Sequence, residues 1–305
     1  LTGNLVVNSG TGNVSFPSTV NGNVAATRTL TVTAGTGTVN FGGVVGGLFS
    51  LLSVTVTGTG GITLTGDVTT STTQSYTGLV TLAASSVLTG TVPTFSAGVA
   101  GAGFDLTLNF SGLTTIDGLL FTGINNLASG NGGTTQLTGN ISTTGTQTYN
   151  DAVTLSGSTT LTTTDDAVSF AATVDAAGAG VQSLSITAGT GTVGFTGAVG
   201  AVNRLNVLTV NSASSLTFSS TVAANSISQV AGSGTTTFSG NVTTSAAAGV
   251  VINAAAISAG AVTINTSAAN GAVTLNGPLT LTGNLVVNSG TGNVSFPSTV
   301  NGNVA

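Results

Sequence analysis

Short runs in which apolar and polar residues alternate fill the chain from one end to the other. In the segment 30–41, which has the sequence LTVTAGTGTVNF, apolar residues alternate with threonine up to a Gly-Thr-Gly interruption, after which Val39 and Phe41 resume the alternation. Alternation with a period of two predicts a strand with one buried face, and a glycine-rich interruption predicts a tight turn. The segment therefore predicts a strand, a turn and a second strand.

Close variants of this segment recur along the chain. Residues 184–195 have the sequence LSITAGTGTVGF, residues 5–16 have LVVNSGTGNVSF, and residues 208–218 follow the same pattern more loosely. A unit of this size cannot bury its own apolar face, so copies have to stack on one another to form a core.

A much longer period is also present. Residues 1–25 return letter for letter as residues 281–305. We interpret residues 1–280 as one full long repeat of a continuous solenoid and residues 281–305 as the start of the next identical repeat, cut from a longer tandem array. The alternative is an artificial duplication of the end. Within the long period, residues 30–68 align without gaps on residues 184–222, an offset of 154 residues.

The spacing of phenylalanines gives the shortest period. Phe170 and Phe195 are 25 residues apart, and Phe218 and Phe238 are 20 apart. Coils of about 20–25 residues containing short strands are typical of a parallel β-helix. We predict an all-β, right-handed parallel β-helix (β-solenoid) with roughly twelve coils in each 280-residue period, because parallel crossovers are almost always right-handed. The side chains expected to form a structural core ladder are Phe16, Phe41, Phe170, Phe195, Phe218, Phe238 and Phe296.

Three local features of the sequence lead to more specific expectations. Gly35, Gly37, Asn8 and Asn140 are expected at corners with positive φ. The apolar runs 48–52 and 118–122 lack polar alternation, so we expect each to be buried on both faces or to cover a groove, and a bulged corner is favoured over a ligand groove. The alanine-rich segment 246–256 is interpreted as two narrow coils with small side chains inside.

Composition argues against catalysis. The chain has no His, Cys, Glu or Lys, which removes most general bases, activated nucleophiles and metal ligands. Asp165 and Asp166 are adjacent, so in a strand they would point to opposite faces, and a solvated corner is the simpler interpretation. We expect no enzyme activity, no catalytic residue, no cofactor and no metal.

Charge and hydropathy restrict the partners further. Only 3% of residues are charged, and the cations are two arginines, so nucleic acid is not an expected partner. No apolar run approaches the ~18 residues of a membrane-spanning helix, so no membrane span is expected in this segment.

Two segments carry a family resemblance. Residues 144–155 (TGTQTYNDAVTL) and 187–199 (TAGTGTVGFTGAV) resemble the repeat region of giant bacterial β-strand-repeat surface proteins, which are similar to filamentous-haemagglutinin-type exoproteins and autotransporter passenger domains. The resemblance implies a right-handed β-helix, an extracellular or cell-surface location, and work as a stalk, adhesin or matrix fibre. No functional residue is carried over, because the match involves core and corner positions.

The resulting hypothesis is a structural repeat of a very long extracellular filament. Its partners would be neighbouring copies of the same repeat, joined end to end in a covalent tandem array rather than as separate subunits, with lateral bundling of fibres or cell-surface glycans as further partners. One alternative is a carbohydrate- or cell-binding adhesin module, which predicts clustered exposed aromatics, and Tyr76 with Tyr149 is too small a set to indicate such a cluster. Another is an ice-binding solenoid, although its Thr-x-Thr rows are interrupted by residues such as Asn8.

Overall fold

The computed structural model describes residues 1–302. Within that part of the chain it contains β-strands, turns and one short 3-10 helix, η1 (Ser267–Ala269), but no α-helix. The strand pairings are parallel, and within each compact unit successive coils stack to form a β-solenoid, consistent with a right-handed parallel β-helix. The predicted fold class is confirmed. Gly, Thr and Val disfavour helix interiors, and the period of two selects strands instead.

The chain separates into two compact units. The first contains Leu1–Gln136 and Ser142–Thr144, and the second contains Leu137–Ile141 and the described residues from Gly145 onward. The boundary falls inside strand β17 (Thr134–Ser142) rather than at a linker. The 280-residue period and the assignment of 281–305 to a following repeat stay predictions, and residues 303–305 lie outside the described part.

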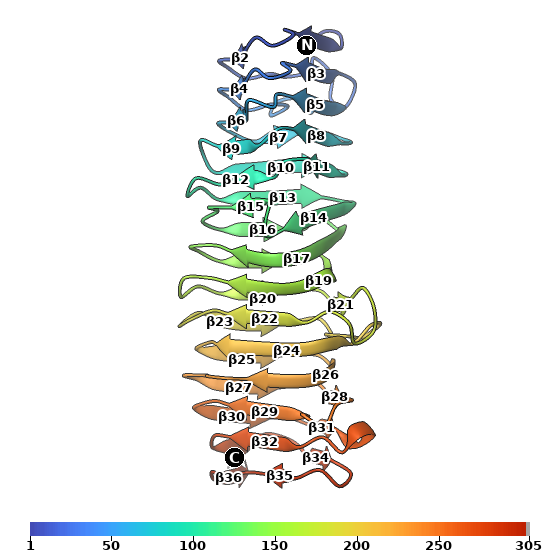
Figure 1. Ribbon diagram of the computed structural model, residues 1–305, viewed down its shortest axis with the longest axis vertical. Helices are drawn as coiled ribbons and strands as arrows, with labels where there is room; N and C mark the ends of the chain where they lie inside the picture. The colour runs from blue at the N-terminus through green and yellow to red at the C-terminus, as the bar shows by residue number, and fades with distance from the viewer. Residues whose placement is uncertain (303–305) are drawn as a thin grey trace. The chain divides into compact units, whose positions relative to one another are not determined.

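In the first unit, successive coils place their strands above one another in separate parallel sheets (Figure 1). The first sheet has the order β1 (Leu5–Asn8), β3 (Thr29–Thr33), β5 (Ser53–Thr57), β8 (Gln74–Thr77), β11 (Pro93–Phe95). The second has β2 (Val14–Phe16), β4 (Val39–Phe41), β6 (Ile62–Leu64), β9 (Val80–Leu82), β12 (Val99–Ala100), β15 (Phe121–Thr122). The third side has β7 (Val68–Thr69), β10 (Ser86–Gly90), β13 (Leu106–Phe110) and β16 (Leu127–Ser129). Strand β14 (Leu113–Asp117) is an end strand of a different sheet.

The second unit repeats this arrangement. One sheet contains β18 (Gln147–Tyr149), β20 (Val168–Phe170), β23 (Thr192–Phe195), β25 (Ser215–Phe218), β27 (Thr235–Phe238), β30 (Ala256–Ala259), β33 (Leu279–Leu281) and β36 (Val300–Gly302). Another contains β19 (Ala152–Thr162), β22 (Leu184–Thr187), β24 (Leu205–Ser212), β26 (Val222–Gln229), β28 (Val242–Thr244), β31 (Val262–Asn265) and β34 (Leu285–Asn288). Beside them, β21 (Val174–Ala176) pairs with β19, and β29 (Val250–Asn253), β32 (Val273–Asn276) and β35 (Val294–Ser295) pair in series.

The core is built by vertical register between coils. In β3, Leu30 and Val32 are fully buried and lie opposite Val54 and Val56 of β5, while the threonines between them face outward. Strand β1 lies 25 residues before β3, and strand β6 lies 18 before β9. Coil length therefore varies, yet most inward apolar positions still lie opposite apolar ones, and exceptions such as Val54 opposite Gln74 place a buried polar side chain in the same column.

Close approach at the corners selects glycine. Gly35 has φ +54°, and a Cβ added to it would lie 2.2 Å from the Gly10 carbonyl oxygen of the preceding coil. The positive-φ prediction is wrong for the other three residues. Gly37 is needed because a Cβ there would lie 2.4 Å from the Gly12 oxygen, whereas Asn8 ends β1 and Asn140 lies within β17.

The two apolar runs are not buried on both faces. Leu48 is 76% exposed and Leu119 is 84% exposed, whereas Leu51 and Phe121 are buried. Each run crosses a corner, so one residue turns into the core and its neighbours turn outward. The run 118–122 does line a groove, which is described below.

The alanine-rich segment is also corrected. Residues 246–256 contain the single strand β29 and the first residue of β30, and Ala247 and Ala248 are exposed in the turn before Gly249. Gly249 has φ +60°, so the chain turns a corner there instead of winding a narrow coil.

Candidate functional site: internal ladders and coil corners

A stack of phenylalanine rings fills the interior of the second unit. The ring centroids of Phe170 and Phe195 are 4.9 Å apart, those of Phe195 and Phe218 are 5.3 Å apart, and those of Phe218 and Phe238 are 5.5 Å apart. Interplanar angles of 2°, 12° and 16° make each contact a stacked one. All four rings are buried. Parallel register causes this geometry, because each phenylalanine is the direct partner of the next along the sheet.

The remaining predicted ladder residues are placed differently. Phe16 and Phe41 stack at 5.2 Å, but they belong to β2 and β4 of the first unit, so the seven phenylalanines do not form one ladder. Phe296 follows β35 and is 36% exposed. Its inclusion among the buried rings is wrong, because no ring of a following coil covers it within the described residues.

Both tyrosines lie inside the solenoid rather than on its surface. Tyr149 begins the second unit's stack, 5.1 Å from Phe170, and Tyr76 stacks on Phe95 at 5.4 Å in the first unit. Both tyrosines are completely buried, so neither contributes to the exposed aromatic cluster that the adhesin alternative predicts. The sequence signal that could have shown this is the shared Gln-x-Tyr pattern at 74–76 and 147–149.

A buried glutamine satisfies each tyrosine hydroxyl. The Tyr76 hydroxyl donates to Gln74 Oε1 at 2.9 Å, and Gln74 Nε2 donates to the carbonyl oxygens of Val68 and Thr89. The second unit repeats the pair, with Tyr149 donating to Gln147 Oε1 at 3.0 Å. Burial raises the pKa of both tyrosine hydroxyls, so they stay neutral donors. Gln147 Nε2 in turn donates to Ile141 and Thr162 oxygens.

A third buried glutamine lacks this arrangement. Gln229 has Ala231 two residues later instead of tyrosine, and its Oε1 accepts a 2.5 Å hydrogen bond from the Thr236 hydroxyl. Gln229 Nε2 has no hydrogen-bond partner among the described residues. The same residue type therefore contributes a complete hydrogen-bond set at position 147 and an incomplete one at 229.

Aspartates act as caps between coils. Asp67 accepts from the Val87 amide at 2.8 Å, Asp165 accepts from Thr190 at 2.8 Å, and Asp175 accepts from Val202 and Asn203. Each donor lies one coil further along the chain. Asp165 is exposed in a turn at φ +62°, as expected for a solvated corner. The carboxylates thus complete backbone hydrogen bonding where strands end.

Asp105 has a more elaborate set of donors. Burial alone would raise its pKa, but hydrogen bonds from the Asn125 side chain and from the backbone and side chain of Asn126 together outweigh burial and hold the pKa below its ordinary value. The ionised form is therefore the one that the fold stabilises.

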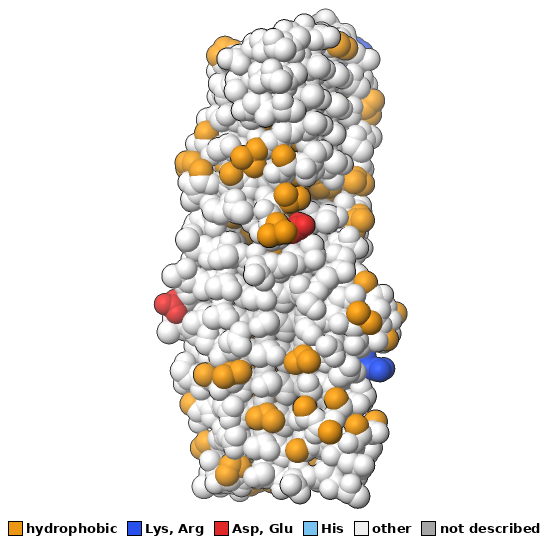
Figure 2. Space-filling view, viewed as in Figure 1, with side chains coloured by type: hydrophobic (Ala, Val, Ile, Leu, Met, Phe, Trp, Pro, Cys, Tyr) orange, Lys and Arg blue, Asp and Glu red, His pale blue; other side chains and the backbone are white. Residues whose placement is uncertain are grey.

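The outer face of the first sheet carries short threonine rows. Thr31 lies opposite Thr55, but the neighbouring positions on either side are Val6 and Ser75. The row is interrupted in the structure as in the sequence. Figure 2 shows that the visible surface carries few charged side chains and scattered hydrophobic ones.

None of these residues forms a recognisable reaction centre. Within residues 1–302 no group of three or more Asp side chains is placed to hold a metal ion. The same residues contain no helix with the length and apolarity needed to cross a membrane.

The comparison with known proteins identifies no relative of this chain. No family model matches the chain, and no curated protein or solved structure is significantly similar to it. The resemblance to bacterial surface-protein repeats therefore remains a prediction from the sequence.

Proposed function

We propose that this chain is a structural repeat of a very long extracellular or cell-surface β-solenoid filament, with copies of the repeat joined end to end in a covalent tandem array. The observation that carries the proposal is how the two identical segments, 1–22 and 281–302, pair with the neighbouring coils. Each segment pairs with a neighbouring coil on one side only. The first copy pairs with the coil that follows it in the sequence, and the second copy pairs with the coil that precedes it.

The first strands of the two copies show this directly. β1 and β34 have the same sequence, LVVN. β1 pairs with the strand that follows it, with Leu5 opposite Leu30, whereas β34 pairs with the strand that precedes it, with Leu285 opposite Val262. Each is the end strand of its sheet. One LVVN strand is therefore compatible with a coil on either side.

The other two sides of the coil follow the same rule. Val14 lies opposite Val39, and its equivalent Val294 lies opposite Val273. Val20 forms a parallel bridge with Val45, and its equivalent Val300 lies opposite Leu279. Superposing the copies gives one coil with partners above and below on all three sides.

The burial of inward-facing side chains also supports this joint, meaning the junction at which one repeat continues into the next. The inward residues Leu5 and Val7 of β1 are half-buried, as are Leu285 and Val287 of β34, although the corresponding residues in β3 are fully buried. A coil covered on both sides would bury these leucines and valines, and removing apolar area from water is favourable. The joint would also protect strand edges that otherwise invite aggregation.

The role of such a filament is mechanical, because a continuous solenoid transmits tension along its length. Backbone hydrogen bonds between coils run along the axis on which coils stack, so tension loads many of them together. The surface of Thr, Ser, Asn and Gly and the resemblance to secreted repeats support an extracellular location. The shortage of acid–base side chains supports a role without catalysis.

Hydrogen exchange tests the proposed joint. A chain of two consecutive 280-residue periods is compared with the 305-residue chain. We expect the amides of the internal LVVN strand at 285–288 to gain protection in the longer chain, while those of β24 stay unchanged in both. Equal exchange of 285–288 in the two chains would reject the tandem array.

A denaturing gel of the native material tests covalent continuity. Material far larger than 29.0 kDa supports one giant chain, whereas a band near that mass supports separate subunits.

A further inference from the structure

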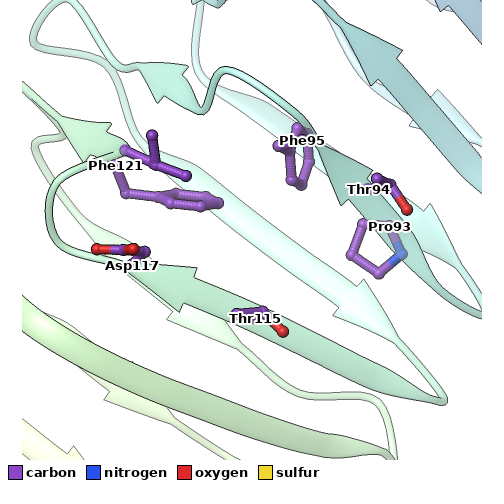
Figure 3. Close-up of a pocket in the computed structure, with 7 residues that line it drawn as sticks. Pro93, Thr94, Phe95, Thr115, Asp117 and Phe121 are labelled. Atoms are coloured by element: carbon purple, nitrogen blue, oxygen red, sulfur yellow. The ribbon is translucent and has the colours of Figure 1, made fainter. Parts of the chain in front are cut away.

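A groove opens in the first unit where one sheet stops. β11 is the last strand of the order β1-β3-β5-β8-β11, and β14, which occupies the following coil, is an end strand of another sheet. The groove between them has a volume of about 240 Å³ and is lined by Pro93, Thr94, Phe95, Thr115, Asp117, Leu120 and Phe121. Figure 3 shows the labelled side chains of these residues around the opening.

Pro93 explains why the sheet stops. The Gln74 amide donates to the Val92 oxygen and the Ser96 amide donates to the Tyr76 oxygen, so positions 92, 94 and 96 of this segment bond toward β8. The alternation of a parallel ladder then directs the backbone of Pro93 and Phe95 toward the groove. Proline has no N–H to donate there, which is typical of an edge strand.

Phe95 provides a fixed apolar wall. One face of its ring stacks on the buried Tyr76 at 5.4 Å, and the ring meets Phe121 edge to face at 5.6 Å. Phe95 is half-buried, so part of the ring faces the groove. Contacts on two sides restrict its rotation, and such a preorganised surface costs little entropy on binding.

The opposite wall combines the apolar Leu120 and Phe121 with the polar Thr115 and Asp117. Asp117 Oδ1 accepts a hydrogen bond from the Leu119 amide at 2.9 Å, and the Leu120 amide donates to the Asp117 carbonyl at 2.9 Å. This turn fixes the carboxylate at the groove and directs Leu119 outward. The exposed Thr115 of β14 adds a hydroxyl group to this wall, and the exposed Thr94 adds one from β11.

We infer that this groove binds one sugar residue of a neutral glycan. A sugar ring offers an apolar C–H face to Phe95 and Pro93, and hydroxyl groups to Asp117, Thr94 and Thr115. The groove contributes the Asp117 carboxylate as an acceptor and the Thr94 and Thr115 hydroxyls as donors and acceptors, and sugar hydroxyl groups can satisfy both, whereas an ammonium group only donates. The lining contains Asp117 and no cation, which disfavours an anionic ligand. The volume lies below the ~300 Å³ of sites for drug-sized molecules, so a single ring fits.

Binding is tested on the full 305-residue chain by NMR titration with two neutral trisaccharides, cellotriose and maltotriose. At about 10 mM sugar, above a millimolar dissociation constant, at least one of them is expected to shift the signals of Thr94, Phe95 and Thr115. Signals of the second unit are expected to stay unchanged. A folded spectrum in which neither sugar moves the lining residues would overturn the inference.

Variants identify the contacts. Asp117→Asn and Thr115→Val are expected to weaken binding about tenfold or less, and Phe95→Leu by a similar factor, since each removes one contact of a small site. Phe49→Leu and Asp166→Asn change matched side chains outside the groove and are expected to leave binding unchanged. If binding is the same in the groove variants as in the unaltered chain, the sugar binds elsewhere and the inference fails.

Two further probes separate ligand classes. Tetramethylammonium chloride tests a cation site, and a heparin tetrasaccharide tests an anion site. Neither is expected to shift the lining residues. Shifts with either probe in the absence of shifts with the neutral sugars would overturn the assignment to a neutral glycan. None of these outcomes depends on the filament joint, which hydrogen exchange tests separately.

Discussion

The aromatic stacks of the two units differ in continuity. In the second unit, rings from Tyr149 to Phe238 stack through five successive strands, β18, β20, β23, β25 and β27. In the first unit, stacking is limited to the pairs Phe16–Phe41 and Tyr76–Phe95, and the sheet that carries Phe95 ends there. Both units use the same alternation of apolar and polar residues.

The difference shows that a continuous ladder has two requirements. A ring must recur at the same position of every coil, and the backbone edge must supply both a donor and an acceptor to the next strand. β25 meets both, whereas β11 has proline at its open edge. Where the second requirement fails, strands separate and a groove can form, so the interrupted unit is the one that offers a lateral site.

The largest expected loss of stability comes from removing one ring of the continuous aromatic stack. Phe195→Ala removes a ring with neighbours on both faces, and we expect a loss of about 3–5 kcal/mol in unfolding free energy. Phe16→Ala, at a half-buried ring with one stacked neighbour, is expected to cost clearly less. Chemical denaturation measures both. Equal losses would mean that ring continuity adds nothing to stability.

The glutamines sharpen the comparison between complete and incomplete hydrogen bonding. Gln147→Leu leaves the buried Tyr149 hydroxyl without its acceptor and removes the side-chain donor to the Ile141 and Thr162 carbonyl oxygens, at about 1–3 kcal/mol for each buried group left unsatisfied. Gln229→Leu removes an amide nitrogen without a partner among the described residues, so its cost is expected to be smaller. Thermal unfolding of both variants provides the measurement. A larger loss at position 229 would contradict the hydrogen-bond assignment.

The corner glycines test close approach. Gly35→Ala adds a Cβ 2.2 Å from the Gly10 oxygen at φ +54°, and we expect a loss of about 1–3 kcal/mol. Gly194→Ala, inside β23, adds a Cβ with no atom within 4 Å, so stability is expected to change by about 0.5 kcal/mol or less. Unfolding midpoints in urea distinguish the two. Similar midpoints would show that the corner can relax.

The smallest expected effect is a change in how the stability of the chain depends on pH. Because the folded pKa of Asp105 lies below its ordinary value of 3.8, its contribution to stability is fully present above that value. The contribution is lost as the pH falls through the lowered folded pKa. Asp105→Asn is therefore expected to be less stable than the unaltered chain at pH 7 and to lose less stability on acidification. Unfolding midpoints between pH 7 and acid check this, and parallel pH profiles for the two proteins would contradict it.

Much of the fold follows from local patterns. The alternation in 30–41, its copies and the 20–25-residue phenylalanine spacing predict parallel coils and the partners of Phe195, since phenylalanine marks the equivalent position in successive coils even where their lengths differ. The candidate site was predicted less well. The burial of Tyr76 and Tyr149 is not predicted, because the sequence alone does not show that Gln74 and Gln147 supply buried acceptors for their hydroxyls.

The sequence by itself determined the period of two, the length of the coil and the identity of the two 25-residue copies, because each of these is a property of residues counted along the chain. Tertiary structure decided which member of an apolar run turns inward, as at Leu51 and Leu48, and where a sheet ends, as at β11. Those outcomes depend on the register of one coil against the next. A corner that is longer or shorter by a few residues changes what a side chain meets without changing the pattern of the strand that carries it.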